Sequence, residues 1–582
     1  MYYKRLRFTF ISVLLFFNTL IFSQGIPSGY FIQPIDGVLQ LSGTFAELRG
    51  GHFHSGIDLR TNSKEGFPVY AAAEGYVVRI KIQPGGFGKA VYINHPNGYT
   101  TVYAHLLSFN EAINNYTRAK QYEAESFEVD LFPPKGLLMV SKGDIIALSG
   151  NSGASEGPHL HFEIRETDTE LPVDPLLFDL PVKDWIRPTM HGLRVYPEGS
   201  GSFINGSPLP ASFSLVGWGP VYRLKITDTI EVAGKFSLGL NATDLLNETS
   251  NRNGVVRYSV FIDSVPAFEW QAVKFAFNET RYVNSFIDYP YYYATNQRYM
   301  RTHTDPGNKL SMYTINPAAG VFSTRPGSLH YVKVVVADSK NNESILRFIV
   351  KATGKPVKSA SEPGAADQSG LLFTINKLNT FAIPGMRISL PGKCLYDSIR
   401  FRYSEQAPLP NSLSRIYQVH KPEVPLQDYF DLSVKTDTLT GIPSSRLTVV
   451  RLNAQNKPSA AGGKYENGFM RVKVRDFGRY AVMADTIAPV IKGVNITNGI
   501  DISGLKNLKV TISDNLSGIK SYRATLNGSW ILMDYDAKNR LLTYEKDALL
   551  LPGENVMILT VTDGVGNNSV MQWMLKNEGV TE

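Results

Sequence analysis

The stretch Gly-Pro-His-Leu-His-Phe-Glu, at residues 157–163, is the most informative part of this sequence. Its apolar surroundings are typical of a β-strand, and side chains alternate across a strand, so His159 and His161 are expected on one face. Gly157 and Pro158 predict a turn just before that strand. Two imidazoles on one face beside a loop favour a metal or catalytic site.

A second pair of ligand-type residues occurs earlier, in Gly-His-Phe-His-Ser-Gly-Ile-Asp at residues 51–58. His54 and Asp58 are four residues apart, which places them on the same face of either a helix or a strand. Gly56 between them allows close approach of the backbone. Two histidines and one aspartate make a three-ligand zinc set with a fourth position for water, whose pKa zinc lowers to about 7.

A third candidate is His105, in Tyr-Ala-His-Leu at residues 103–106. Each of the three motifs is a weak indication by itself, because isolated histidines are commonly structural. Together they predict a metal site in a β-rich domain. Spacing does not assign the roles, since His52 also forms a His-x-His pair with His54, and His95 could replace His105.

From about residue 45 to 165 the sequence resembles the lysostaphin/LytM-type zinc metalloendopeptidases, which cut peptidoglycan peptides. The family pattern His-x-x-x-Asp, Tyr-x-His-Leu and Gly-Pro-His-Leu-His-Phe-Glu is present in this order. The sequence departs from the family in a longer segment between the last two motifs. The resemblance implies an antiparallel β-sheet catalytic domain.

The same resemblance implies that one zinc ion binds to His54, Asp58 and His161. It makes His105 and His159 the catalytic histidines that are not ligands, and it gives no catalytic role to the other two histidines of the region. One catalytic histidine would take a proton from the attacking water. The other would stabilise the oxyanion or protonate the leaving amine.

The start of the chain predicts a signal peptide over residues 1–24, because a basic segment precedes an interrupted apolar run that is short for a membrane span. An uncleaved anchor is the alternative. We therefore expect export to the periplasm, cell envelope or outside, with no transmembrane span after cleavage. The net charge of +7 falls to 7 − 3 = +4 without the three basic signal residues and is spread thinly, which argues against nucleic acid. The single cysteine, Cys394, excludes a Cys-rich zinc site.

The remaining sequence alternates short apolar strands with Gly, Pro, Asn and Asp turns, so the fold class is expected to be mainly β. The chain of 582 residues suggests several domains. After the signal peptide, the predicted division is: 25–185, LytM-type domain with an insertion at about 109–135 that contains a helix; 186–353, β-sandwich module; 354–484, linker and β-rich middle module; 485–582, immunoglobulin-like β-sandwich module.

A faint internal repeat supports two related modules. Thr243-Asp and Ser513-Asp occupy matching places, as do Ala337-Asp-Ser-Lys-Asn-Asn and Thr562-Asp-Gly-Val-Gly-Asn-Asn. Trp270 and Trp530 follow the first pair in both copies. The Asp/Asn clusters favour turns, and calcium binding is the alternative, although no regular ligand spacing is present.

The leading prediction is an exported zinc metalloendopeptidase of peptidoglycan stem or cross-link peptides, whose β modules contact envelope proteins or glycans. One alternative is a catalytically silent LytM-type regulator that activates other wall hydrolases. Another is a wall-binding or adhesion protein, supported by Tyr289-Pro-Tyr-Tyr-Tyr, whose aromatic faces could stack on sugars.

Overall fold

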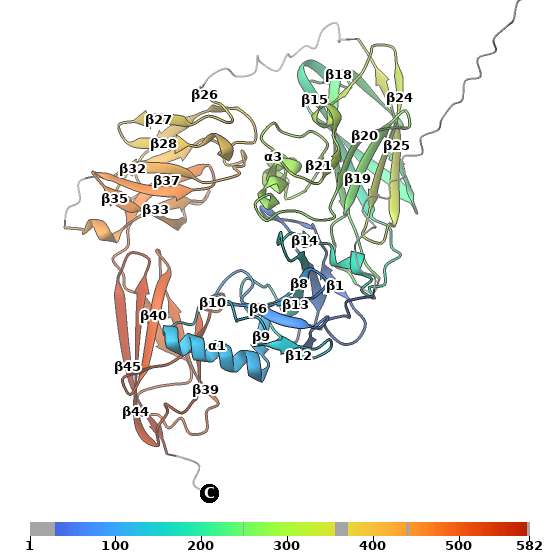
Figure 1. Cartoon of the computed structure of the whole chain (residues 1–582). Coiled ribbons are helices and arrows are strands. Elements are labelled where there is room, and N and C mark those ends of the chain that lie inside the picture. Colours follow the sequence, from blue (N-terminus) through green and yellow to red (C-terminus); the bar gives the residue numbers. More distant parts are fainter. Residues whose placement is uncertain (1–28, 248, 355–369, 438–440, 579–582) are drawn as a thin grey trace, which may run out of the picture.

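The computed structural model describes residues 29–247, 249–354, 370–437 and 441–578. The predicted signal peptide and nearly all of the predicted linker after Gly354 lie outside these ranges. The described chain is mainly β, which confirms the predicted fold class (Figure 1). Within these ranges no helix combines the length and apolar character needed to cross a membrane. The domain boundaries stay a prediction, and we use the names N-terminal domain (29–185), second module (186–354), third module (370–484) and last module (485–578).

The N-terminal domain is built on a nine-stranded sheet of order β1-β4-β13-β8-β7-β6-β10, in which β11 pairs with β6 and β14 with β13. A three-stranded sheet, β5-β12-β9, packs beside it. The elements are β1 (Leu41–Gly43), β2 (Leu48–Arg49), β3 (His52–Phe53), β4 (Ile57–Arg60), β5 (Pro68–Tyr70), β6 (Gly75–Ile82), β7 (Lys89–Asn94), β8 (Tyr99–Ala104), β9 (Leu106–Phe109), α1 (Glu111–Ala124), β10 (Val129–Leu131), β11 (Met139–Val140), β12 (Ile145–Ser149), β13 (His159–Glu166), β14 (Pro172–Val173) and the 3-10 helix η1 (Pro175–Phe178).

The central strand β13 is the element that brings the sequence motifs together. It pairs antiparallel with β4, where His161 lies opposite Asp58, and with β8, where His161 lies opposite Ala104. Alternate residues of β13 face the buried core, which contains Leu160, Phe162 and Ile164. The two-residue period therefore turns the intervening histidines to the other face.

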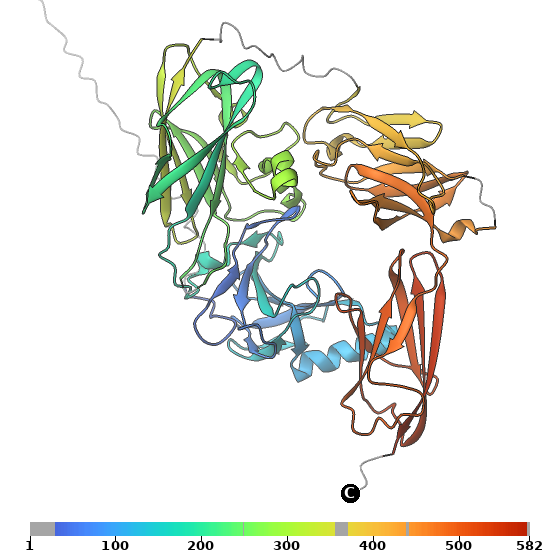
Figure 2. The same ribbon diagram turned by 180° about the vertical axis from the view of Figure 1, so that it is seen from behind.

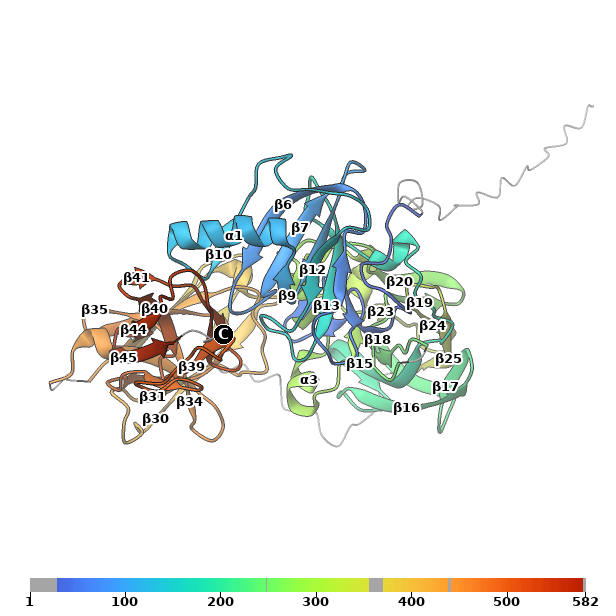
Figure 3. The ribbon, with the colours of Figure 1, turned by 90° about the horizontal axis from the view of Figure 1, so that it is seen from below.

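The helix expected in the insertion is present as α1. Asn110 caps its start by accepting a 3.0 Å hydrogen bond from the backbone N–H of Ile113, and Glu125 ends it in the left-handed conformation. Ile113, Thr117 and Gln121 form its buried face. In Figure 3 the helix lies beside the last module, so the insertion provides a contact between the two ends of the described chain.

The second module contains an eleven-stranded sheet, closed by an additional β18–β25 pairing. Its core is continuous with the N-terminal domain, because Phe45 and Phe53 pack among its buried aromatic residues. The elements are β15 (Thr189–Ile204), β16 (Ala211–Trp218), β17 (Val221–Leu224), β18 (Thr229–Thr243), β19 (Arg257–Ile262), β20 (Val265–Gln271), η2 (Thr280–Tyr282), α2 (Val283–Phe286), α3 (Tyr289–Thr295), β21 (Met300–Arg301), β22 (Tyr313–Ile315), η3 (Pro317–Gly320), β23 (Phe322–Ser323), β24 (Leu329–Ala337) and β25 (Glu343–Ala352).

The third module consists mainly of two five-stranded antiparallel sheets, β27-β28-β32-β36-β35 and β30-β31-β37-β33-β34, around one core. Its elements are β26 (Leu371–Phe373), β27 (Asn379–Ile383), β28 (Met386–Leu390), η4 (Gly392–Cys394), β29 (Ile399–Phe401), β30 (Tyr403–Gln406), β31 (Ile416–Val419), β32 (Phe430–Lys435), η5 (Ser444–Arg446), β33 (Leu447–Leu452), β34 (Pro458–Gly462), β35 (Lys464–Glu466), β36 (Phe469–Val474) and β37 (Gly478–Ala484).

The last module has two four-stranded antiparallel sheets, β38-β39-β43-β42 and β41-β40-β44-β45, around its own core. This arrangement is a β-sandwich, and its immunoglobulin-like character stays a prediction. Its strands are β38 (Val490–Gly493), β39 (Asn507–Ser513), β40 (Ile519–Leu526), β41 (Ser529–Trp530), β42 (Met533–Asp536), β43 (Leu541–Glu545), β44 (Gly553–Asp563) and β45 (Asn568–Asn577).

The last module returns to the N-terminal domain, so the four parts follow one another around a ring (Figures 1 and 2). Trp530 packs edge-on against Tyr122 of α1, with ring centroids 5.1 Å apart, and Tyr122 also donates a hydrogen bond to Asp547. Trp270 is instead fully buried in the second module. The two tryptophans of the proposed repeat are therefore not equivalent, because one fills a core and the other forms a contact between domains.

Candidate metal centre and active site

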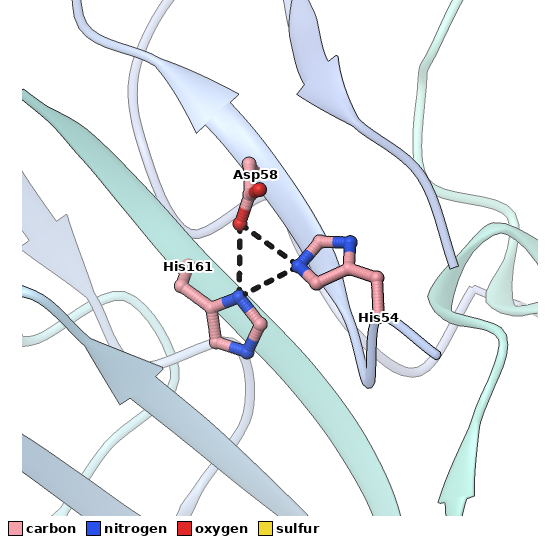
Figure 4. A group of neighbouring side chains, drawn as sticks. All are labelled: His54, Asp58 and His161. Carbon is pink, nitrogen blue, oxygen red and sulfur yellow. Dashed lines mark hydrogen bonds and ion pairs between the residues drawn. The ribbon is translucent and has the colours of Figure 1, made fainter. Parts of the chain in front are cut away.

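The three predicted metal ligands form one buried cluster (Figure 4). Asp58 Oδ1 lies 2.9 Å from His161 Nδ1 and 3.1 Å from His54 Nε2, and the two nitrogens are 3.0 Å apart. His54 comes from the segment just before β4, Asp58 from β4 and His161 from β13. The antiparallel pairing of these two strands thus places ligands from distant parts of the sequence in contact.

The donor atoms of this cluster fit a zinc ion. Tetrahedral ligands about 2.0–2.1 Å from zinc are separated by about 3.3 Å, which is close to the separations found here. His54 Nδ1 donates a 2.8 Å hydrogen bond to the carbonyl oxygen of Thr44, which leaves the lone pair of Nε2 directed at the cluster. His161 Nε2 likewise donates to Glu163 and leaves Nδ1 as the donor atom for a metal.

The electrostatics of the cluster favour a cation. Burial alone would raise the pKa of Asp58, but the nearby rings of His54, His159 and His161 hold that pKa well below its usual range. Burial would lower the pKa of His161, yet Asp58 and Glu163 raise it to about 9. Burial lowers the pKa of His54. In the absence of metal, a proton on His161 therefore supplies the positive charge that lies next to the Asp58 and Glu163 carboxylates.

Sequence reasoning missed the residues that support the ligands. Glu163, fully buried, accepts hydrogen bonds from His161 Nε2 at 2.9 Å, from Ser55 Oγ at 2.5 Å and from Arg165 Nε at 2.6 Å. Arg49 Nη2 contacts the second oxygen of Asp58 at 2.5 Å. Glu163 could have been predicted from the two-residue period of β13, because Glu163 shares a face with His159 and His161. No local pattern indicated Arg49.

The two predicted catalytic histidines lie together beside the ligands. The rings of His105 and His159 have centroids 4.8 Å apart, and His159 Nε2 is 3.5 Å from Asp58 Oδ1. His105 Nδ1 donates a 2.8 Å hydrogen bond to the carbonyl oxygen of Ser152, and His159 Nδ1 donates one of 2.8 Å to that of Gly157. Each ring thus keeps Nε2 as a free lone pair, which a proton acceptor needs.

His105 is held as a neutral imidazole. Burial, with His161 and His159 nearby, lowers the pKa of His105 to about 3. Its backbone adopts the left-handed conformation, with φ of 59°, directly after β8. This unusual backbone geometry for a residue other than glycine is commonly retained at functional sites.

The other two histidines of the region lie outside this group. His52 is exposed, and its ring lies 3.2 Å from the carbonyl oxygen of Gly50. His95 is buried between the carbonyl oxygen of Glu74 and the hydroxyl of Thr101, with 2.7 Å to each. Both are therefore placed where a structural or surface role was expected.

The last module contacts the loop that holds both predicted catalytic histidines. Lys538 Nζ donates hydrogen bonds to the carbonyl oxygens of Asn151 and, at 3.2 Å, Ser155. Lys89 and Asp534 form a second bridge of 2.5 Å between the two domains. The loop between β12 and β13 is thus supported from a module whose sequence lies several hundred residues away.

Comparison with known proteins finds matches for two parts of the chain. Residues 52–123 and 137–175 match the model of peptidase family M23, and residues 371–485 match that of the Zu5-like domain. The DD-carboxypeptidase/endopeptidase Mpg of Neisseria meningitidis is 34% identical over 158 residues, which are 27% of each chain. The peptidoglycan DD-endopeptidase ShyB of Vibrio cholerae is 32% identical over 129 residues, or 22% of this chain and 24% of that protein.

The N-terminal domain is a peptidase family M23 domain, as the resemblance predicted. The chain spans about a quarter of the length of the curated relatives named above. Among solved structures, the catalytic domain of lysostaphin from Staphylococcus simulans aligns with 24% of this chain and 91% of that domain, at 23% identity and a TM-score of 0.18.

Proposed function

We propose that this protein is an exported zinc metalloendopeptidase that hydrolyses peptide bonds in peptidoglycan stem or cross-link peptides. The observation that carries the proposal is the contact of His54 Nε2, Asp58 Oδ1 and His161 Nδ1, within 3.1 Å of one another, in an M23 domain. Relatives of this domain are named as peptidoglycan endopeptidases, which supports the substrate class.

In this proposal His54, Asp58 and His161 hold the ion, and Glu163 and Arg49 orient two of these ligands. A zinc ion in such a site acts as a Lewis acid and makes bound water more acidic. The proton transfers are carried out by side chains of the protein.

His159 and His105 are the groups that move protons. His159 Nε2 is 3.5 Å from the ligand atom of Asp58, and this proximity makes it our choice to accept the proton of the attacking water. The proton taken from the water is then delivered to the leaving amine, and His105, whose neutral ring also presents an Nε2 lone pair, is the second group that can carry it between the two. The carbonyl oxygens of Gly157 and Ser152 fix both rings in the required tautomer.

The alternatives receive less support from the structure. A catalytically silent regulator needs no complete ligand set, and here all three ligands and both catalytic histidines are grouped. An adhesive role based on the tyrosine run is weakened because Tyr291 is covered by Arg194, whose guanidinium lies 3.9 Å from its ring centre. Tyr293, by contrast, is 54% exposed, so one aromatic face stays available.

Digestion of purified peptidoglycan by the full chain tests the proposal. We expect soluble muropeptides whose masses identify the bond cleaved, loss of products after treatment with a chelator, and recovery with zinc. His161→Ala is the matched inactive control. Unchanged peptidoglycan in the presence of zinc, with one zinc bound per chain, would contradict the proposed activity.

A further inference from the structure

Two clusters of three aspartates lie far from the active site, one in the second module and one in the last. In each cluster, one carboxylate oxygen from each of the three residues lies within 4.8 Å of the other two. The first consists of Asp184, Asp244 and Asp338, and the second of Asp485, Asp514 and Asp563. We call them the second-module triad and the last-module triad.

The two triads occupy equivalent places in their modules. Asp184 and Asp485 lie in the segments that lead into the first strand of each module. The second members come directly after a strand, β18 or β39, and the third members lie at the end of β24 or β44, where the hairpin to the following strand begins. The repeat suspected from sequence therefore corresponds to a repeated three-dimensional arrangement.

The hydrogen bonds around the second-module triad hold its side chains in place. Asp338 Oδ1 accepts hydrogen bonds from the backbone N–H groups of Lys340 and Asn342. The side-chain amide of Asn342 donates to Asp338 Oδ2 at 2.8 Å and to the carbonyl oxygen of Asp184 at 3.3 Å.

The last-module triad repeats this pattern bond for bond. Asp563 Oδ1 accepts from the N–H groups of Val565 and Asn567, and the Asn567 amide donates to Asp563 Oδ2 at 2.7 Å and to the carbonyl oxygen of Asp485 at 2.9 Å. The two triads, although made of different aspartates, are thus surrounded by the same pattern of hydrogen bonds.

What points to a ligand is the presence of buried oxygens without donors. Asp244 is only 1% exposed, and its Oδ1 has no hydrogen-bond partner within the described ranges. Asn253, 2% exposed, lies directly opposite Asp244 in an antiparallel bridge, and its Oδ1 has none either. Asp514 Oδ1 is the corresponding atom of the other triad and is also buried without a partner. A buried oxygen without a hydrogen-bond partner destabilises the folded state unless a ligand contacts it.

The charge of the second-module triad is also uncompensated. In the described part of the chain, no lysine or arginine forms an ion pair of 4 Å or less with its three carboxylates. Close carboxylates without a counter-ion repel one another, and a bound cation would offset this repulsion.

We propose that each triad binds one calcium ion, with Asn253 Oδ1 as a further ligand in the second module. The donors are all oxygens, which calcium prefers and zinc does not. Calcium accepts about six to eight oxygen ligands in a flexible cage, whereas magnesium requires near-ideal octahedral geometry. Because Asp184 and Asp485 lie before the first strands, β15 and β38, each ion would fix the strands of a module to the segment that leads into them.

Calorimetric titration of the metal-free full chain with calcium chloride tests this proposal. We expect two calcium ions per chain and a rise in Tm when calcium is added. Asp244→Asn and Asp514→Asn should each bind one ion, and the double variant none, while all retain one zinc per chain. Asp228→Asn and Glu554→Gln, at exposed positions of the same modules, are the matched controls and should keep both ions.

The Tm of Asp244→Asn without calcium distinguishes a metal site from a cluster of aspartates that only stabilises turns. Asp244 Oδ1 has no donor to lose, so neutralising this side chain relieves repulsion and should leave the calcium-free Tm equal to or above that of the wild type. Adding calcium should then give a smaller rise than in the wild type. Absence of calcium uptake by the wild type at 1 mM, two ions retained in both variants, or equal binding of magnesium would each overturn the assignment.

Discussion

His161 donates a 2.9 Å hydrogen bond from Nε2 to Oε1 of Glu163, two residues further along β13. Both side chains are buried, and Arg165 and Ser55 complete the shell around the carboxylate. This bond fixes the tautomer of His161 and directs Nδ1 at the other two ligands. In the proposed metal site, the orientation of one ligand therefore depends on a residue that is not itself a ligand.

Glu163→Gln is expected to weaken zinc binding by about tenfold to a hundredfold, because it removes the charge that raises the basicity of His161. The measurement is a competition titration against a fluorescent zinc chelator. Glu170→Gln, at an exposed position just after β13, is the control and should bind zinc like the wild type. Unchanged affinity in Glu163→Gln would show that Glu163 serves only to pair with Arg165.

His105→Ala and His159→Ala should each reduce turnover by about 10² to 10⁴, the range of a lost general acid or base. Both variants should retain one zinc per chain, since neither side chain is assigned as a ligand. Elemental analysis and a peptide-cleavage assay on the same preparation measure the two quantities. His52→Ala, an exposed neighbour, should leave both unchanged. Loss of zinc from either catalytic variant would reverse our assignment of ligands and proton carriers.

Zinc affinity should rise with pH. In the metal-free protein the pKa of His161 is raised to about 9, so zinc must displace a proton at neutral pH. We expect an increase approaching about tenfold per pH unit from pH 7, levelling off above about pH 9. Isothermal titration in buffers of different ionisation enthalpy would detect the released proton. An affinity independent of pH between 7 and 9 would be inconsistent with a protonated His161.

The raised pKa of His161 also determines whether the metal-free protein gains or loses stability as pH rises. A folded-state pKa above the ordinary value of about 6.5 means that the proton stabilises the folded state. This stabilisation is complete below about pH 6.5 and disappears as pH rises to about 9. The Tm of the metal-free protein should therefore fall over this interval more than that of His161→Asn. Equal slopes for the two proteins would exclude His161 as the source.

Lys538→Ala tests the contact between the last module and the active-site loop. Because Lys538 binds the loop whose carbonyl oxygens hold His105 and His159, its loss should lower turnover roughly threefold to tenfold through misplacement of the two rings, without loss of zinc. Lys520→Ala, exposed in the same module, is the control. A rise in turnover would show instead that the last module restricts access to the site.

The local part of the site was predictable because its spacing matches the geometry of strands. Residues His159 and His161 share a face in any strand, and the resemblance to a known family made Asp58, His54 and His105 candidates. The helix α1 was also expected from composition. The equivalence of Trp270 and Trp530 was wrong, since similar flanking turns do not determine whether an aromatic side chain enters a core or a contact between domains.

The sequence by itself determined the mainly β fold class and the ligand types of the proposed metal centre, because both follow from residue identity and short-range periodicity. The tertiary structure decided the support from Arg49, the contact of Lys538 with the active-site loop and the grouping of Asp184, Asp244 and Asp338. These contacts join residues far apart in the chain, and their geometry depends on strand pairing and domain packing, which no local pattern encodes.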